Sequence, residues 1–232
     1  MITLAVDTTA QIASVAVLRD GRVLAEYTVN SGNTHSVTLL PMIKHTLETV
    51  GLDAKDVDLY ALSAGPGSFT GVRIGAATLK GLAFAYNKPC VAVSTLEAMA
   101  ENLRGLDGVI CPVINARRGQ VYGALFESKA GTLARLTEDD TLLVEELPEL
   151  LSKYDSVWFT GDAYPMVREF TNNITPDNLC SVSAAAVAKV GERIYNEAED
   201  KSAFTDTALL PVYLKKPQAE REREERLKKE TN

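Results

Sequence analysis

The sequence predicts an α/β protein built from two similar lobes on either side of a central cleft. Strand-like and helix-like segments follow one another in the same order in both halves of the chain, which is typical of a duplicated unit. A polar residue ends the first strand of each half, Asp7 and Asn115. Because ligands of open α/β sheets lie beyond the carboxyl ends of the strands, these residues are expected to face each other across the cleft. The expected lobes are residues 1–105 and 106–215.

The first half begins with three strand-like runs: 1–7, 12–19 and 22–29. Asp20-Gly21 joins the last two and predicts a tight hairpin, because a type I′ turn needs positive φ at both central positions. A helix is expected over 34–50, with Leu40, Ile43, Leu47 and Val50 on one face and Pro41 causing a kink or a late start. A strand, a helix and a strand follow at 57–64, 70–86 and 90–93. Ser94 to Glu97 is a capping box that opens a further helix, to about residue 103.

The second half repeats this order from residue 109. Its expected strands and helices are a strand at 109–115, a hairpin of 120–127 and 132–137, a helix at 144–153, a strand at 157–160, a short helix, a strand around 179–182 and a helix at 183–196. The tail at 216–232 alternates Glu with Arg and has little apolar content, so we expect it to be a solvated helix or disordered.

The composition excludes several classes of protein. The 24 basic and 31 acidic residues give a net charge of −7, which argues against a protein that grips nucleic acid mainly by its own surface. Cys90, Cys111 and Cys180 lie far apart in apolar segments and are expected to be buried thiols rather than disulfides or metal ligands. No signal peptide and no membrane-spanning run is apparent, so a cytoplasmic location without membrane contact is expected.

The most distinctive stretch is the glycine-rich loop at residues 65–75. It is not a P-loop, because Thr70 and Gly71 stand where that motif requires Gly-Lys, and it lacks the glycine pattern of a dinucleotide fold. Its glycines recur every fourth residue, and a second row of small residues follows on another face of the helix. The rows are Gly67, Gly71, Gly75 and Ala77, Gly81, Ala85. Such rows let a neighbouring helix approach closely, so packing is favoured over ligand binding.

Five segments together resemble one known family. They are Asp7-Thr8-Thr9, residues 63–75, residues 94–98, residues 115–122 and Pro211-Val212-Tyr213-Leu214. The family is TsaB (YeaZ), a subunit of the bacterial machinery that makes threonylcarbamoyladenosine in tRNA. It is part of the actin, sugar-kinase and heat-shock-ATPase superfamily, so the resemblance implies a duplicated ribonuclease-H-like fold.

The resemblance implies a non-catalytic scaffold, a pseudo-enzyme within a tRNA-modifying complex. With a TsaD-type catalytic paralogue and a TsaE-type ATPase, such subunits are required to transfer the threonylcarbamoyl group from threonylcarbamoyl-adenylate. The acceptor is N6 of the anticodon-adjacent adenosine in tRNAs that read codons beginning with A. ATP and a metal are expected in the partner subunits rather than in this chain, and tRNA is contacted only through the complex. Alone, such a subunit forms a homodimer through the surface of the first-lobe helices that also forms the heterodimer.

The residues agree with a chain that has no catalytic residue and no metal site. His35 and His45 are ten positions apart, whereas two imidazoles on one helical face need a spacing of three or four. Asp7 is followed by Thr8 instead of glycine, and an amide at Asn115 replaces the family's usual carboxylate and holds magnesium less well. Asp7, Thr8 and Thr9 are therefore expected to be a vestigial cofactor site.

Two groups of residues are the candidate contacts. Leu39, Met42, Gly71, Gly75, Thr78 and Leu82 are expected at the partner interface. Arg117 and Arg118 are interpreted either as solvated turn residues or as contacts to an anion or a partner. Two other functions stay open: a small-molecule kinase or ATPase of the same superfamily, and a metal-dependent peptidase.

Overall fold

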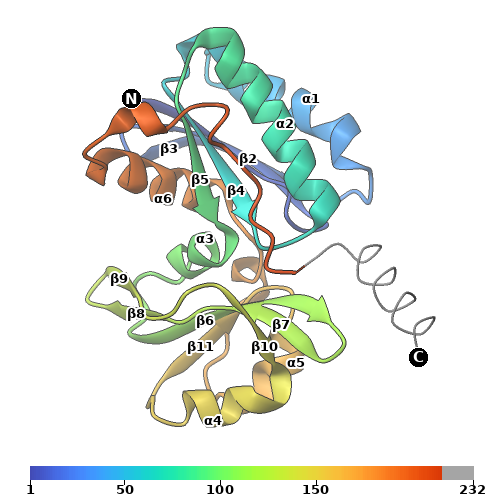
Figure 1. The fold of residues 1–232 in the computed structure, drawn as a ribbon, viewed down its shortest axis with the longest axis vertical. Coiled ribbons are helices and arrows are strands. Elements are labelled where there is room, and N and C mark those ends of the chain that lie inside the picture. Colours follow the sequence, from blue (N-terminus) through green and yellow to red (C-terminus); the bar gives the residue numbers. More distant parts are fainter. Residues whose placement is uncertain (216–232) are drawn as a thin grey trace, which may run out of the picture.

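The computed structural model describes residues 1–215 and contains two β-sheets, stacked end to end along the long axis of the molecule (Figure 1). The charged tail at 216–232 lies outside the described residues. No helix among residues 1–215 combines the length and apolar character needed to cross a membrane.

The first sheet has the strand order β3-β2-β1-β4-β5. Its strands are β1 (Ile2–Asp7), β2 (Ala13–Arg19), β3 (Arg22–Val29), β4 (Leu59–Gly65) and β5 (Cys90–Ser94). β1, β2 and β3 are antiparallel neighbours, and β4 and β5 run parallel to β1. Asp20 and Gly21 both have positive φ, 51° and 77°, so the hairpin predicted from these two residues is confirmed.

Helices cover both faces of the first sheet. α1 (His35–Thr49) and α2 (Phe69–Tyr86) lie side by side on one face, and α6 (Ala184–Glu197) packs on the other (Figure 1). Polar contacts fix α6 there: Thr3 Oγ1 donates a 2.7 Å hydrogen bond to Glu192 Oε1, and Glu26 accepts one from Ser183 Oγ at 2.7 Å.

Two helices connect the halves of the chain. α6 comes from the second half of the chain but packs on the first sheet, and α3 (Thr95–Glu101) lies between the sheets, in contact with β4, β5, β6 and α6. The first sheet is therefore completed by a helix from the range 106–215, while the expected division into residues 1–105 and 106–215 stays a prediction.

The second sheet is arranged around β6 (Gly108–Arg117). Its other strands are β7 (Gln120–Gly123), β8 (Phe126–Lys129), β9 (Thr132–Arg135), β10 (Asp140–Leu143) and β11 (Val157–Thr160). The strand predicted at 120–127 is interrupted at residues 124–125, and both of its parts run antiparallel along β6. The short helices are α4 (Leu147–Leu151) and α5 (Tyr164–Val167), with 3-10 turns at η1 (Ala54–Asp56), η2 (Val144–Glu146), η3 (Arg168–Phe170), η4 (Asp177–Leu179) and η5 (Lys201–Ala203).

The strand predicted around 179–182 is wrong, since this segment is a 3-10 turn followed by irregular chain. Side chains occupy the place beside β11 where a further strand would pair. Thr175 Oγ1 donates to the carbonyl of Phe159 at 2.6 Å, while Thr171 Oγ1 and Asn173 Nδ2 donate to the carbonyl of Val157 at 2.6 and 2.8 Å. The edge carbonyls are thus satisfied without a strand.

The buried face of α1 differs from the predicted one. Leu40 is 56% exposed, whereas Leu39 and Met42 are only 1% and 3% exposed and belong to the first-lobe core with Ile43 and Leu47. The buried face of α1 consists of residues 39, 42, 43, 46 and 47, which recur with the helical period. It shares Ile43 and Leu47 with the expected face but is rotated about the helix axis, so that Leu40 lies outside it. Leu39 and Met42 therefore have almost no surface to offer a partner, which argues against the prediction that they lie at the interface.

Candidate functional site

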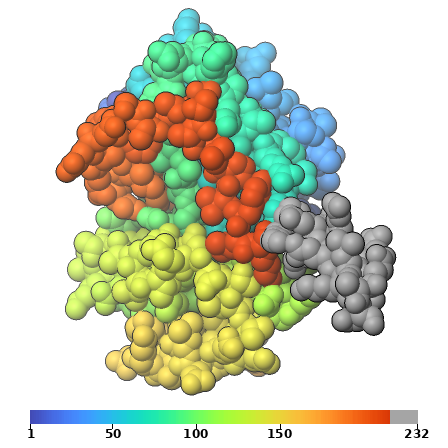
Figure 2. Space-filling model, viewed as in Figure 1, coloured from blue at the N-terminus to red at the C-terminus, as the bar shows by residue number. Residues whose placement is uncertain are grey.

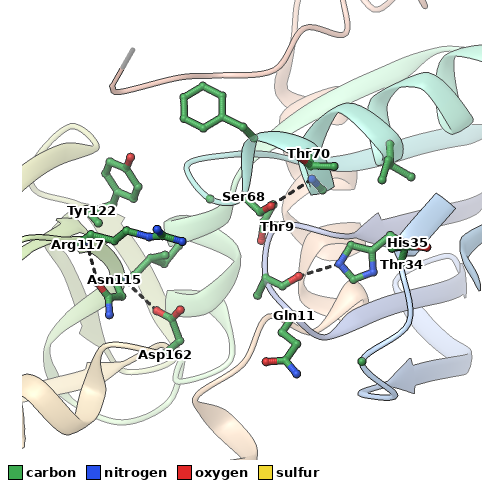
Figure 3. Close-up of a pocket in the computed structure, with 18 of the residues that line it drawn as sticks. Thr9, Gln11, Thr34, His35, Ser68, Thr70, Asn115, Arg117, Tyr122 and Asp162 are labelled. Atoms are coloured by element: carbon green, nitrogen blue, oxygen red, sulfur yellow. Dashed lines mark hydrogen bonds between the residues drawn. The ribbon is translucent and has the colours of Figure 1, made fainter. Parts of the chain in front are cut away.

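A cavity of about 630 Å³ lies between the two lobes, at the carboxyl ends of β1 and β6 (Figure 3). Its first-lobe wall comes from the loop after β1 and from the amino-terminal ends of α1 and α2. Its second-lobe wall comes from the end of β6 together with Tyr122 and Asp162. The cleft expected from the duplicated order is therefore present.

The Asp7-Thr8-Thr9 turn is held by its own hydrogen bonds. Asp7 Oδ1 accepts from Thr9 Oγ1 at 2.7 Å and from the Thr9 amide at 3.3 Å, and Thr8 Oγ1 donates to the carbonyl of Gly71 at 2.7 Å. Burial raises the pKa of the Asp7 carboxyl to about 6, because it is only 1% exposed. Only Thr9 of these three residues lines the cavity, so Asp7 does not face Asn115 across it.

The first row of small residues in the glycine-rich loop makes room for this turn. A Cβ at Gly71 would collide with the carbonyl oxygen of Thr8, and one at Gly75 would lie 2.6 Å from Thr8 Oγ1 and 2.8 Å from Leu62 Cδ1. Ser68 caps α2, since its Oγ accepts from the Gly71 amide at 3.2 Å. Gly71 and Gly75 are buried in the chain's own structure, which argues against the prediction that they contact a partner.

The second row of small residues lies on the surface. Ala77, Gly81 and Ala85 are exposed, and a Cβ at Gly81 would meet nothing within 4 Å. Thr78 is half-buried beside this row, and Leu82 packs partly on the first-lobe core. The row with exposed surface available to a partner is therefore the second one, whereas the predicted interface residues Gly71 and Gly75 belong to the first.

Large apolar side chains are also exposed on α2 and on its neighbour α1. Val37 and Leu40 of α1 are 69% and 56% exposed, and Phe84 of α2 is 77% exposed. The blue and teal atoms of these neighbouring helices form one continuous side of the molecule in the space-filling view (Figure 2). We call the surface formed by Val37, Leu40, Ala77, Gly81, Phe84 and Ala85 the α1–α2 face.

The second-lobe wall is built on a tight turn after β6. The amide of Asn115 donates to Asp162 Oδ1 at 2.8 Å, and Asn115 Oδ1 accepts from the Arg117 amide at 2.8 Å. Arg117 and Arg118 both have left-handed backbone, with φ of 64° and 56°. The Arg117 side chain points from β6 toward the first-lobe wall (Figure 3), where it presents a positive charge to the cavity.

The two histidines are separated, as their spacing predicts. His35 Nε2 lies 2.8 Å from the carbonyl oxygen of Ala10 at the edge of the cavity, whereas the His45 ring packs edge-on against Tyr27. Within residues 1–215, no three His, Cys, Asp or Glu side chains are grouped so that they could hold a metal ion. Cys90 and Cys111 are buried thiols, as expected, and Cys180 is half-buried.

Comparison with known proteins gives consistent matches. Residues 22–223 match the family described as TsaD, tRNA N6-adenosine threonylcarbamoyltransferase. The tRNA threonylcarbamoyladenosine biosynthesis protein TsaB of Bacillus subtilis (strain 168) is 33% identical over 221 residues, covering 95% of this chain and 96% of that protein. TsaB of Escherichia coli (strain K12) is 34% identical over 220 residues, covering 91% and 94%.

Solved structures agree with these matches. YeaZ from Pseudomonas aeruginosa superposes with a TM-score of 0.77 at 28% identity, covering 92% of this chain and 99% of that one. Ethanolamine utilization protein EutJ from Carboxydothermus hydrogenoformans has a TM-score of 0.52 at 14% identity, covering 82% and 90%, and shows the fold alone. The ribonuclease-H-like, two-lobe fold expected from the sequence is confirmed.

Proposed function

The chain belongs to the family described as TsaD and, within it, to the TsaB group of tRNA threonylcarbamoyladenosine biosynthesis proteins; from this premise we propose that it is a non-catalytic subunit that activates a TsaD-type catalytic paralogue. With a TsaE-type ATPase, the complex transfers the threonylcarbamoyl group from threonylcarbamoyl-adenylate to N6 of the anticodon-adjacent adenosine. The tRNAs that the complex modifies read codons that begin with A. ATP and the metal act in the partner subunits, and the complex works in the cytoplasm.

The α1–α2 face is the observation that carries this proposal. It combines three large, mostly exposed apolar side chains with an exposed helical glycine on two neighbouring helices, and neither feature favours helices that face only solvent. Without a Cβ at Gly81, a second helix can approach the backbone of α2 closely. The face therefore fits an apolar pair of helices on the paralogue. In the absence of the paralogue, it fits α1 and α2 of a second copy of this chain.

The polar groups at the cleft favour a non-catalytic subunit over a phosphoryl-transfer enzyme. A carboxylate that holds magnesium must present an oxygen to the ion. Asp7 Oδ1 is instead occupied by the Thr9 hydroxyl and amide, and the corresponding position in the second lobe is the amide Asn115. Asp7, Thr8 and Thr9 therefore act as structural residues of the turn below α2.

Arg117 is the cleft residue to which we assign a contact. The structure offers its side chain no bonded partner among residues 1–215, and its direction leads into the cavity (Figure 3). The left-handed turn holds Arg117 at the cavity, and Arg118 follows it in the same turn. We propose that this turn meets an anionic group of a partner subunit when the complex assembles.

A transfer assay tests the proposal. The catalytic paralogue is mixed with unmodified tRNA and threonylcarbamoyl-adenylate in a single turnover, with and without this chain, and the chain alone is incubated with ATP and magnesium. We expect transfer that depends on the chain and no hydrolysis by the chain alone. Hydrolysis by the chain alone, without any effect on transfer, would instead identify a kinase or ATPase.

A further inference from the structure

The last described segment of the chain, residues 205–215, crosses from the first lobe to the second. We call it the strap. It runs beside α2 and ends next to β7 (Figure 1), and its surface is continuous with both lobes in the space-filling view (Figure 2). We propose that the strap is a clamp that sets the separation of the two lobes and thereby the width of the cavity.

The strap is anchored firmly to the first lobe. Leu209 is 1% exposed in the core of that lobe, and the Val212 amide donates a 2.7 Å hydrogen bond to the carbonyl of Ala64. Gly65, with φ of 119°, accommodates this contact, since a Cβ there would collide with the carbonyl oxygen of Val212. The glycine-rich loop is thus shaped to receive the strap.

Aromatic stacking extends the first-lobe anchor onto α2. The Tyr213 ring stacks on Phe69 with a centroid separation of 4.7 Å and an angle of 13° between the planes. Arg73 Nε donates to the Tyr213 hydroxyl at 2.8 Å, and its guanidinium also lies over both rings. These contacts fix the direction in which the chain leaves the first lobe.

The second-lobe anchor is the ammonium group of Lys215. It donates to the carbonyl of Ala116 at 3.0 Å and to Gln120 Oε1 at 2.7 Å, and it lies 5.5 Å from the centre of the Tyr122 ring. Ala116 directly precedes the left-handed pair of arginines. One side chain therefore ties the strap to the turn that carries Arg117 into the cleft.

The two anchors hold opposite walls of the same cavity. Phe69 lines it from the first lobe, and Ala116 and Tyr122 line it from the second. The first-lobe anchor includes a buried leucine and a backbone bond. Toward the second lobe, the polar contacts of Lys215 are joined by Leu214, which packs on a buried cluster that includes Ile114, Ala116 and Tyr122. Movement of the lobes that widens the cavity therefore stretches or releases the contacts of Lys215 with the turn after β6.

The test measures the distance between the lobes in the full chain. Spin labels are attached at Lys55→Cys in the first lobe and Glu149→Cys in the second, both exposed positions, in a Cys180→Ser background. Cys90 and Cys111 need no replacement, because burial raises the pKa of each thiol to about 12 and keeps it unreactive at neutral pH. Electron–electron double resonance then gives the distribution of distances.

Lys215→Met is the test variant, since it keeps an apolar stem and removes the ammonium. We expect a shift to longer distances, a broader distribution, and faster amide hydrogen exchange at residues 116–120. Lys201→Met is the matched control, because Lys201 also packs its ammonium over a ring, that of Tyr195, and lies outside the strap; it should leave both readouts unchanged. Circular dichroism verifies that each variant is folded. A distribution and exchange rates in Lys215→Met that match the parent chain would overturn the clamp.

Discussion

Thr8 and Gly71 interlock at the floor of the cleft: the Thr8 hydroxyl donates to the carbonyl of Gly71, and the Thr8 carbonyl fills the space that a Cβ at Gly71 would need. The turn after β1 and the first turn of α2 therefore fit together only if residue 71 is glycine. This relationship gives the glycine-rich loop a role within the chain and distinguishes it from the α1–α2 face, which we propose meets a partner.

Gly71→Ala is expected to destabilise the fold by about 1–3 kcal/mol, because the added methyl group meets backbone atoms that cannot move aside easily. Gly81→Ala is the control in the same helix. Its methyl group enters open space, and replacing an exposed helical glycine should raise stability by about 1 kcal/mol. Urea unfolding of both variants checks the two signs. Equal free energies of unfolding for the two variants would mean that the Thr8 carbonyl leaves room for a methyl group at residue 71.

Gly81→Leu is expected to weaken association at the α1–α2 face at least about tenfold, or 1.4 kcal/mol, by holding the facing helix away. The monomer should be no less stable than the parent chain, since leucine is a good helix former. Analytical ultracentrifugation of the chain alone and with its paralogue measures the effect. Lys189→Leu, on the exposed side of α6, controls for added apolar surface. An unchanged dissociation constant would move the interface elsewhere.

Asp7→Asn is expected to stabilise the protein at pH 7 by up to about 3 kcal/mol, the cost of ionising a buried carboxyl whose pKa is raised to about 6 from 3.8. Below about pH 4 the carboxyl is protonated in both the folded and the unfolded state and contributes nothing. Between pH 4 and 6 only the unfolded state loses the proton readily, so stability falls as pH rises. Denaturant midpoints measured across this range should fall for the parent chain and stay flatter for the variant.

The same variant also tests the assignment of Asp7 as a structural residue. The transfer assay with the paralogue should give the parent rate, because Asp7 contacts neither nucleotide nor metal in the proposed function. Loss of transfer in a folded Asp7→Asn protein would contradict that assignment.

Thr175→Val is expected to cost about 1–3 kcal/mol, because it removes the hydroxyl that satisfies the buried carbonyl of Phe159. Thr171→Val is the matched control: it removes a similar bond to Val157, whose carbonyl keeps its bond from Asn173. Thermal unfolding should therefore show a clearly larger loss for the first variant. Equal losses would mean that the edge of β11 does not depend on Thr175.

Arg117→Gly should raise stability by about 1 kcal/mol, since glycine adopts a φ of 64° without the cost that a side chain imposes. The same change removes the guanidinium from the cleft and should lower transfer by the paralogue. Ala130→Gly, at a φ of 49° in the β8–β9 hairpin, should give a similar stability gain with full activity. If Arg117→Gly supports transfer by the paralogue at the parent rate, Arg117 contributes only to the turn and contacts no partner.

The elements that were predicted well carry strong local signals. Asp20-Gly21, the cap at Ser94 and the apolar run of β11 are each determined by a few neighbouring residues. The strand expected around 179–182 failed because three polar side chains from 171–175 satisfy the edge of β11, and such bonds leave no periodic pattern.

The candidate site was harder to predict than the fold. The two rows of small residues in α2 look alike in sequence, and only the position of Thr8 against Gly71 shows which row faces inward. The strap was visible only as a short closing motif, because its contacts with Phe69 and Ala116 join residues more than 90 positions apart.

The packing of α6, from the second half of the chain, on the first sheet has a consequence for biosynthesis. While a ribosome is still translating residues 106–183, the face of the first sheet that α6 will cover is bare, although every strand of that sheet has already been made. At about 5–20 residues per second, this interval lasts roughly 4 to 16 s. The nascent first lobe therefore remains an apolar surface, and a substrate for chaperones, until the second lobe has emerged and α6 arrives to close it.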